Sequence, residues 1–156
     1  MDTLQVRLCP DEVRYQFSAR DVIIRFDGLK AYKRQTSTAA ADFLHYLRTK
    51  FPFRIKAIQI DGGSEFKDQF EEVCRRRDIL LFELPPQSPK LNGHVERANR
   101  THSEVEDVDL NLEEHNRQLE KWEYVYNYIR PHQALDYLTP YEYYRQWKKI
   151  KPPRCH

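Results

Sequence analysis

Alternating apolar and polar positions run through the first third of the chain. The segment "MDTLQVRL" alternates as far as the turn signal Pro10-Asp11. After it, "VRYQFSARDVIIRF" continues the β-type pattern up to a second break at Asp27-Gly28. The pattern therefore predicts three strands in an antiparallel meander.

A helical period replaces this alternation from Thr36 onward. Apolar side chains recur there three and four positions apart, at Ala40, Phe43, Leu44 and Leu47. Two later segments, "IKAIQI" and "ILLFEL", read as short buried strands, and the first is apolar at nearly every position, as expected for a strand covered on both faces. Between them Ser64 can cap a second helix, with one apolar stripe formed by Phe66, Phe70 and Val73.

The prolines of "PPQSP" end this strand and helix series. Ser88-Pro89 could open a helix through "NGHVERANRTHSEVE". An amphipathic helix that stops before Pro131 follows, with the apolar positions Leu112, Leu119, Trp122, Tyr126 and Ile129. A capping box then starts the last helix, formed by Thr139, Pro140 and Glu142. Three strands, helix, strand, helix, strand and several helices predict an α/β domain, in which a mixed sheet carries helices on its faces.

Composition limits the function classes only weakly. The 156 residues suffice for one core, and 26 basic against 24 acidic residues give a net charge of +2, which does not by itself indicate a nucleic-acid partner. Cys9, Cys74 and Cys155 lack the paired spacing of a disulfide framework or a zinc site. No signal peptide and no membrane-spanning apolar run is present, so we expect reduced thiols in a cytoplasmic protein without a membrane partner.

Asp61 is the first candidate for chemistry. It directly follows an apolar strand and precedes Gly62 and Gly63, at the strand end where open α/β sheets bind ligands. An aspartate before two glycines is more often part of a turn, so the position alone does not decide between a turn residue and a ligand for a cation. A second acid is needed.

Glu96, in "SPKLNGHVERANR", supplies that acid. On a helix, Asn92, Gly93 and Arg100 would share its face, which is polar and has a gap at the glycine, unlike a packing surface. The alternative is an exposed helix with a Glu96–Arg100 ion pair, which would be nearly neutral in energy.

Three blocks of the sequence together resemble a known family. "QIDGGSEF", then "LPPQSPKLNGHVERANRTHSEV" with Glu96 35 positions after Asp61, resembles the integrase catalytic core (DDE group) of bacterial insertion-sequence transposases, which is related to retroviral integrases. "YNYIRPHQALDYLTPYEYY" resembles the segment that closes this core. The resemblance spans nearly the whole chain, with the blocks in the family's order.

The resemblance implies a ribonuclease-H-like fold: a mixed five-stranded sheet with flanking helices and a C-terminal helical segment. Residues 1–150 would form the core, with the catalytic part in 1–107, closing helices in 108–150 and a tail in 151–156. It also implies a third acid in the first strand. We assign Asp2, in "MDTLQV", to that role in preference to Asp21, which matches an acid that belongs to the family's sheet architecture.

The implied function is DNA transposition and integration. Asp2, Asp61 and Glu96 would hold Mg²⁺ or Mn²⁺, two ions in the active complex, because clustered carboxylates repel one another unless cations neutralise them. The ions would support strand cleavage and then attack of a DNA 3′-hydroxyl on target DNA, without a covalent protein–DNA intermediate. The alternatives are a nuclease of the same fold and a non-catalytic DNA-binding or assembly relic of a transposase.

The expected partners are element-end DNA, target DNA and further copies of the chain, with a dimer in the active complex and a bacterial, nucleoid-associated location. The expected DNA contacts, next to Glu96, are Lys90, Asn92, His94, Arg97 and Arg100. The arginines of "CRRRD", residues 74–78, are more simply explained by the dipole of the helix that ends there. Family transposases also carry an N-terminal region that reads the element's ends. We see no match to it here, so activity of this chain alone stays open.

Overall fold

The computed structural model describes residues 1–9, 12–84 and 111–150. Its strands are β1 (Asp2–Cys9), β2 (Glu12–Arg20), β3 (Asp27–Tyr32), β4 (Ala57–Ile60) and β5 (Leu80–Glu83). Its helices are α1 (Ser37–Lys50), α2 (Gln69–Arg76), α4 (Leu112–Tyr124) and α5 (Pro140–Ile150). Short 3₁₀ turns η1 (Ser64–Phe66) and η3 (Gln133–Leu135) and a π-helical turn, η2 (Val125–Ile129), complete the order. No helix within these ranges is long and apolar enough to cross a membrane.

The strands form a mixed arrangement, as the sequence predicts. β1, β2 and β3 pair antiparallel in that order, with Thr3 opposite Phe17 and Phe17 opposite Lys30, whereas β4 and β5 pair in parallel. Within the described residues these are one three-stranded and one two-stranded sheet. The Met1 amino group donates a hydrogen bond of 2.5 Å to the Gln59 carbonyl, which links the start of β1 to β4.

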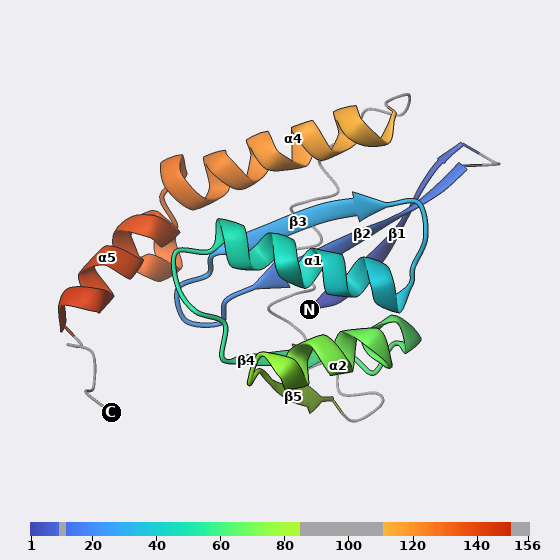
Figure 1. The fold of residues 1–156 in the computed structure, drawn as a ribbon. Coiled ribbons are helices and arrows are strands. Elements are labelled where there is room, and N and C mark those ends of the chain that lie inside the picture. The colour runs from blue at the N-terminus through green and yellow to red at the C-terminus, as the bar shows by residue number, and fades with distance from the viewer. Residues whose placement is uncertain (10–11, 85–110, 151–156) are drawn as a thin grey trace.

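The main core lies between the antiparallel strands and α1, which Figure 1 shows lying across β2 and β3. Ala40, Phe43, Leu44 and Leu47 are all buried, so the helical spacing correctly predicts the inner face of α1. Phe17 of β2 packs against the rings of Phe43 and Phe66, with centroids 5.7 and 6.2 Å away. The predicted stripe of the second helix also holds in part, since Phe70 is buried and Val73 is half-buried against the same cluster.

Two strand predictions from the first third are wrong in their bounds. β2 ends at Arg20, because Val22 and Ile23 lie in an exposed turn whose aspartate, Asp21, accepts the Ile23 and Ile24 backbone N–H groups. Asp27-Gly28 is not a break but the start of β3. A side chain at Gly28 would collide with Leu47 of α1, so this glycine permits close helix–sheet packing.

The prediction that β4 and β5 are buried is also wrong. In β4 only Ile58 and Ile60 are buried, and Ala57 and Gln59 are exposed within the described part of the chain. In β5, Leu80 is 63% exposed and Phe82 57% exposed. Runs of apolar residues therefore do not mark two covered faces here, because the described helices cover only the face that carries Ile58 and Ile60.

The predicted cap at Ser64 is likewise displaced. Ser64 begins the 3₁₀ turn η1, and the residue before α2 is Asp68, whose side chain makes no capping hydrogen bond. Ser37 at the start of α1 instead accepts the Phe70 backbone N–H and donates to the Lys67 carbonyl, so a neighbouring helix organises the entry to α2.

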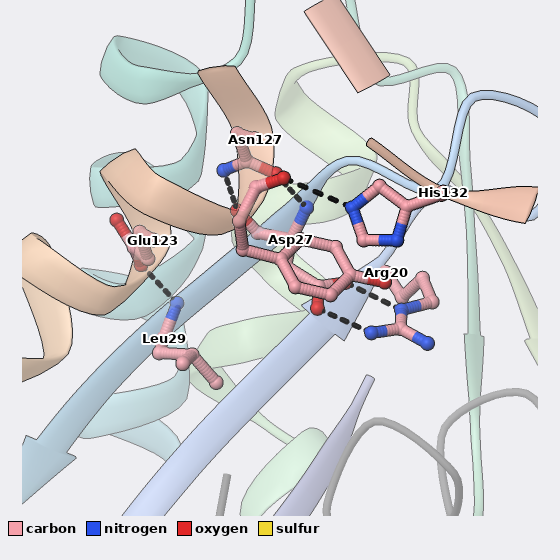
Figure 2. Close-up of polar contacts among 7 residues, drawn as sticks. Arg20, Asp27, Leu29, Glu123, Asn127 and His132 are labelled. Carbon is pink, nitrogen blue, oxygen red and sulfur yellow. Dashed lines mark hydrogen bonds and ion pairs between the residues drawn. The ribbon is translucent and has the colours of Figure 1, made fainter. Parts of the chain in front are cut away.

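Helix α4 runs along the outer edge of β3 (Figure 1) and satisfies that edge with side chains. Asn116 accepts the Ala31 N–H and donates to the Ala31 carbonyl at 2.8 and 3.1 Å. Asn127, just beyond α4 in η2, does the same for Asp27 at 2.8 Å each. Glu123 accepts the Leu29 N–H (Figure 2). Alternate residues of an edge strand point their N–H and C=O groups outward, so these side chains take the place of a neighbouring strand.

A buried ion pair sits at the end of this edge. Arg20 donates from Nε to Asp27 at 2.6 Å and its guanidinium lies 5.0 Å from the centre of the Tyr126 ring. His132 packs on the same ring and donates from Nε2 to the Tyr126 carbonyl at 3.1 Å (Figure 2). These contacts give His132 a structural role.

The C-terminal helices close the core, with one exception to the predicted stripe. Leu119 and Tyr126 are buried and Leu112 and Trp122 pack against Leu119's cluster, whereas Ile129 is 57% exposed. The capping box of α5 is confirmed: Thr139 N–H donates to Glu142, and Glu142 N–H donates to the Thr139 hydroxyl.

Candidate active site

Asp61 lies where β4 ends. Ile60 before it is buried, whereas the Asp61 carboxylate is exposed. The Gly63 N–H donates to Asp61 Oδ1 at 3.2 Å, and Gly62 has a φ of +81°, which glycine adopts without steric cost. The carboxylate thus stabilises the turn through one oxygen, and it still faces solvent. Asp61 can therefore stabilise the turn and still be free to bind a cation.

Asp2 lies at the start of β1, beside the same end of β4. Its side chain is half-buried and accepts the Thr3 N–H at 2.8 Å. Burial lowers the pKa of the Met1 amino group to about 6, and the charges of Asp2 and Asp61 act in the opposite direction. The Met1–Gln59 hydrogen bond sets the start of β1, which carries Asp2, beside the end of β4, which Asp61 follows.

Asp21 is held elsewhere. It accepts two backbone N–H groups in the turn after β2, at 2.9 and 2.7 Å. Asp21 therefore has a structural use in this turn.

Two further carboxylates border the turn, and sequence reasoning missed both. A side chain at Gly62 would collide with the Glu83 carboxylate, and one at Gly63 would collide with that of Glu65. Glu65 is 4% exposed and accepts a 2.6 Å hydrogen bond from Gln35. The position of Glu65 inside "QIDGGSEF" was the available signal in the sequence. It was missed because a charged side chain is normally expected to face solvent.

The remaining predicted residues lie outside the described ranges. These are the third acid, Glu96, and the expected DNA contacts Lys90, Asn92, His94, Arg97 and Arg100. Within residues 1–9, 12–84 and 111–150 no three metal-ligating side chains are grouped closely enough to hold an ion. Of the three predicted metal ligands, the structure therefore describes two, Asp2 and Asp61.

The chemistry of this pair fits a hard divalent cation. Carboxylate oxygens are the ligands that Mg²⁺ and Mn²⁺ prefer, and Mg²⁺ is commonly bound through one or two carboxylates with water in its other positions. Asp61 is exposed enough to share an ion with a substrate, and the two glycines after it leave room for the Glu83 and Glu65 carboxylates beside the turn.

Residues 77–140 match the family described as the integrase core domain. A putative integrase of Spiroplasma virus SpV1-C74 is 28% identical over 117 residues, which cover 65% of this chain and 32% of that relative. The chain thus spans about a third of the length of this curated relative.

Solved structures with the same fold are retroviral integrase cores. The HTLV-2 integrase catalytic core domain in complex with magnesium superposes with a TM-score of 0.71 at 16% identity, covering 90% of each chain. The catalytic core domain of BIV integrase gives 0.67 at 18% identity, covering 95% of this chain and 94% of that one. A chain of the simian T-cell lymphotropic virus intasome gives 0.73 at 18% identity, covering 99% of this chain and 54% of that chain. The fold is therefore that of the ribonuclease-H-like integrase cores.

Proposed function

We propose that this chain, an integrase core domain by family match and by fold, is the catalytic core of a DNA transposase or integrase. The observation that carries the proposal is the hydrogen bond from the Met1 amino group to the Gln59 carbonyl, because it joins the start of β1, with Asp2, to the strand that Asp61 follows. The matched family segment, residues 77–140, includes Glu96, the acid expected to complete the site.

Asp2, Asp61 and Glu96 would hold the divalent ions. When bound, such ions lower the pKa of a coordinated water and stabilise charge that develops at phosphorus. The chain's own contribution is positional: β4 fixes Asp61, the Gly63 N–H orients its Oδ1, and the turn leaves its carboxylate open to solvent. The magnesium complex of the HTLV-2 core supports a cofactor of this class.

The proposed partners are DNA and further copies of the chain. The HTLV-2 core has been solved in trimeric and dimeric forms, and the simian viral relative was solved as an intasome. We also propose a bacterial, nucleoid-associated location.

The first prediction concerns Asp61→Asn. We expect the parent chain to nick supercoiled plasmid DNA in Mn²⁺. The variant should nick it at a rate lower by a factor on the order of 100 or more, because a lost metal ligand removes several kcal/mol of transition-state stabilisation. The rise in melting temperature that Mn²⁺ causes should disappear in the same variant. Gel analysis of nicked plasmid and a thermal melt with and without Mn²⁺ measure the two effects.

Asp136→Asn is the matched control, because Asp136 is exposed, lies after η3 and has a left-handed backbone that asparagine also adopts. It should leave nicking and the Mn²⁺ effect unchanged. Retained nicking in Asp61→Asn would contradict the proposal. Joining of a labelled 3′-hydroxyl oligonucleotide to the plasmid separates a transposase from a nuclease, which would cleave without joining.

A further inference from the structure

Four arginines from three separate elements surround a hollow of about 330 Å³ at the opposite end of β4 from Asp61. Arg48 comes from the last turn of α1, Arg54 from the loop before β4, and Arg76 and Arg77 from the end of α2. The remaining lining residues are Ile55, Asp78 and Ile79. This group is called the arginine hollow below.

The arginine hollow carries uncompensated positive charge. Arg76 donates to Glu72 at 2.7 Å, but Arg48, Arg54 and Arg77 form no ion pair within the described part of the chain. Asp78 is the one acid in the lining. All four arginine side chains are exposed, so each guanidinium keeps donors available for an outside partner.

Helix dipoles account for only part of this arrangement. Arg48, Arg76 and Arg77 stand at helix ends, where the partial negative charge of the last carbonyl groups stabilises cations. Arg54 belongs to no helix, yet it faces the same hollow. The sequence explanation of "CRRRD" by the dipole of α2 therefore does not explain why arginines from three elements converge.

The position of the arginine hollow separates it from the candidate active site. Ile55 precedes β4 and Asp61 follows it, so at about 3.3 Å per extended residue the two lie up to roughly 20 Å apart. Along one DNA strand, phosphates are spaced by about 3.4 Å per base pair, so this distance corresponds to roughly six base pairs.

We propose that the arginine hollow binds backbone phosphates of DNA at a distance from the position where Asp61 acts. The guanidinium fork matches phosphate oxygens in a bidentate manner, and a set of arginines without base-reading neighbours binds backbone and not sequence. The inference deepens the proposed function, since such a contact would hold a duplex several base pairs away from the reacting phosphate. DNA binding itself does not depend on catalysis.

The test is the affinity of the full chain for a fluorescent 30-base-pair duplex in EDTA, measured by anisotropy between 50 and 200 mM salt. The variant replaces Arg48, Arg54 and Arg77 by glutamine. We expect binding to weaken about tenfold or more, and the slope of log K against log salt to fall by about 2 to 3, close to one for each lost phosphate contact.

A matched control removes the same charge elsewhere, with Arg75, Arg117 and Lys148 replaced by glutamine. These side chains are exposed and lie outside the arginine hollow. The control should keep the affinity within about twofold. An equal loss of DNA affinity in both triple variants would show an effect of total charge alone and would overturn the inference. An unchanged DNA affinity in the variant of the hollow, together with a lowered melting temperature, would show that its arginines only stabilise helix ends and would also overturn the inference.

Two further readouts separate the possible failures. Unlabelled duplex should displace the fluorescent duplex at a much lower concentration than poly-glutamate of equal charge. Displacement at equal concentrations would identify an acidic protein surface as the partner and overturn the inference. Asp61→Asn should bind the duplex like the parent chain. If the parent chain binds DNA through the arginine hollow but never nicks it, the proposed function fails and this inference stands. If the parent chain nicks DNA and the triple variant of the hollow binds it normally, this inference fails and the proposed function stands.

Discussion

At the scale of single residues, Glu123 joins two parts of the fold at a high electrostatic cost. Burial raises the pKa of Glu123 to about 8, while hydrogen bonds from the Leu29 N–H and the Tyr46 hydroxyl, and the charge of Lys50, act in the opposite direction. Tyr46 donates to it at 2.8 Å, and burial together with Glu123 raises the pKa of that hydroxyl. Glu123 thus favours its neutral form in the folded chain.

The sign of its pH effect follows from this shift. Between an unfolded pKa near 4.5 and a folded pKa of about 8, the folded chain holds a proton that the unfolded chain has released. Stability from this group is therefore present at pH 4.5 and is lost as the pH rises through 8.

We expect Glu123→Gln to gain stability relative to the parent chain by on the order of 4 kcal/mol between pH 5 and pH 8.5. Urea unfolding at the two pH values measures the difference. The histidines, including His115 and His132, whose pKa values burial lowers, titrate alike in both proteins and cancel. Glu120→Gln, at an exposed position on the same helix, should show no such trend. A difference that does not change with pH would mean that Glu123 is ionised throughout.

At the scale of elements, the pairing of α4 and η2 with the edge of β3 predicts one sensitive position. Asn127→Ala should lower the free energy of unfolding by about 2–3 kcal/mol, because it leaves both the N–H and the carbonyl of the buried Asp27 without a partner. Arg117→Ala on the exposed side of α4 should stay within about 0.5 kcal/mol. Urea titration compares them. Similar values for the two variants would show that packing alone attaches α4.

Elements with a local cause could be predicted from the sequence. The inner face of α1 follows from the spacing of Phe43, Leu44 and Leu47, and the capping box of α5 from Thr139 and Glu142, because each signal lies within a few residues. The position of Asp61 at the end of a strand could be predicted in the same way, whereas the choice of Asp2 comes from the family resemblance.

Features that depend on distant parts of the chain could not be predicted. Gly28 looks like a break until Leu47 is packed against it, and Asn127 gives no sign of its partner because Asp27 lies 100 positions earlier. Glu65 reads as a surface acid until Gln35 is placed beside it. Tertiary contacts override local propensity at each of these positions.

At the scale of the whole molecule, the described helices α4 and α5 both contact the part of the chain that carries α1 and the antiparallel strands. α4 packs Leu119 against Leu29 and Ala31 of β3, and Tyr144 of α5 donates to the Pro52 carbonyl at 2.8 Å. Removing residues 108–156 would expose this surface together with the edge of β3.

We therefore expect a chain ending at residue 107 to be insoluble, since it presents an unpaired strand edge beside apolar residues. A chain that lacks only residues 151–156 is the control and should remain soluble. Sedimentation of cell lysates compares the two. A soluble fragment ending at residue 107 whose melting temperature still rises with Mn²⁺ would show that the core does not need α4 and α5. These helices would then be candidates for binding a partner.

The same β3 edge has a consequence for the newborn polypeptide. Asp27 leaves the ribosome 100 residues before Asn127. At about 5–20 residues per second, the backbone groups at the edge of β3 therefore stay without these side-chain partners for roughly 5–20 s. We expect nascent chains stalled before α4 to be held by chaperones and those stalled well beyond α5 to be released. Pull-down of stalled complexes would reveal this order, and equal chaperone occupancy at both lengths would contradict it.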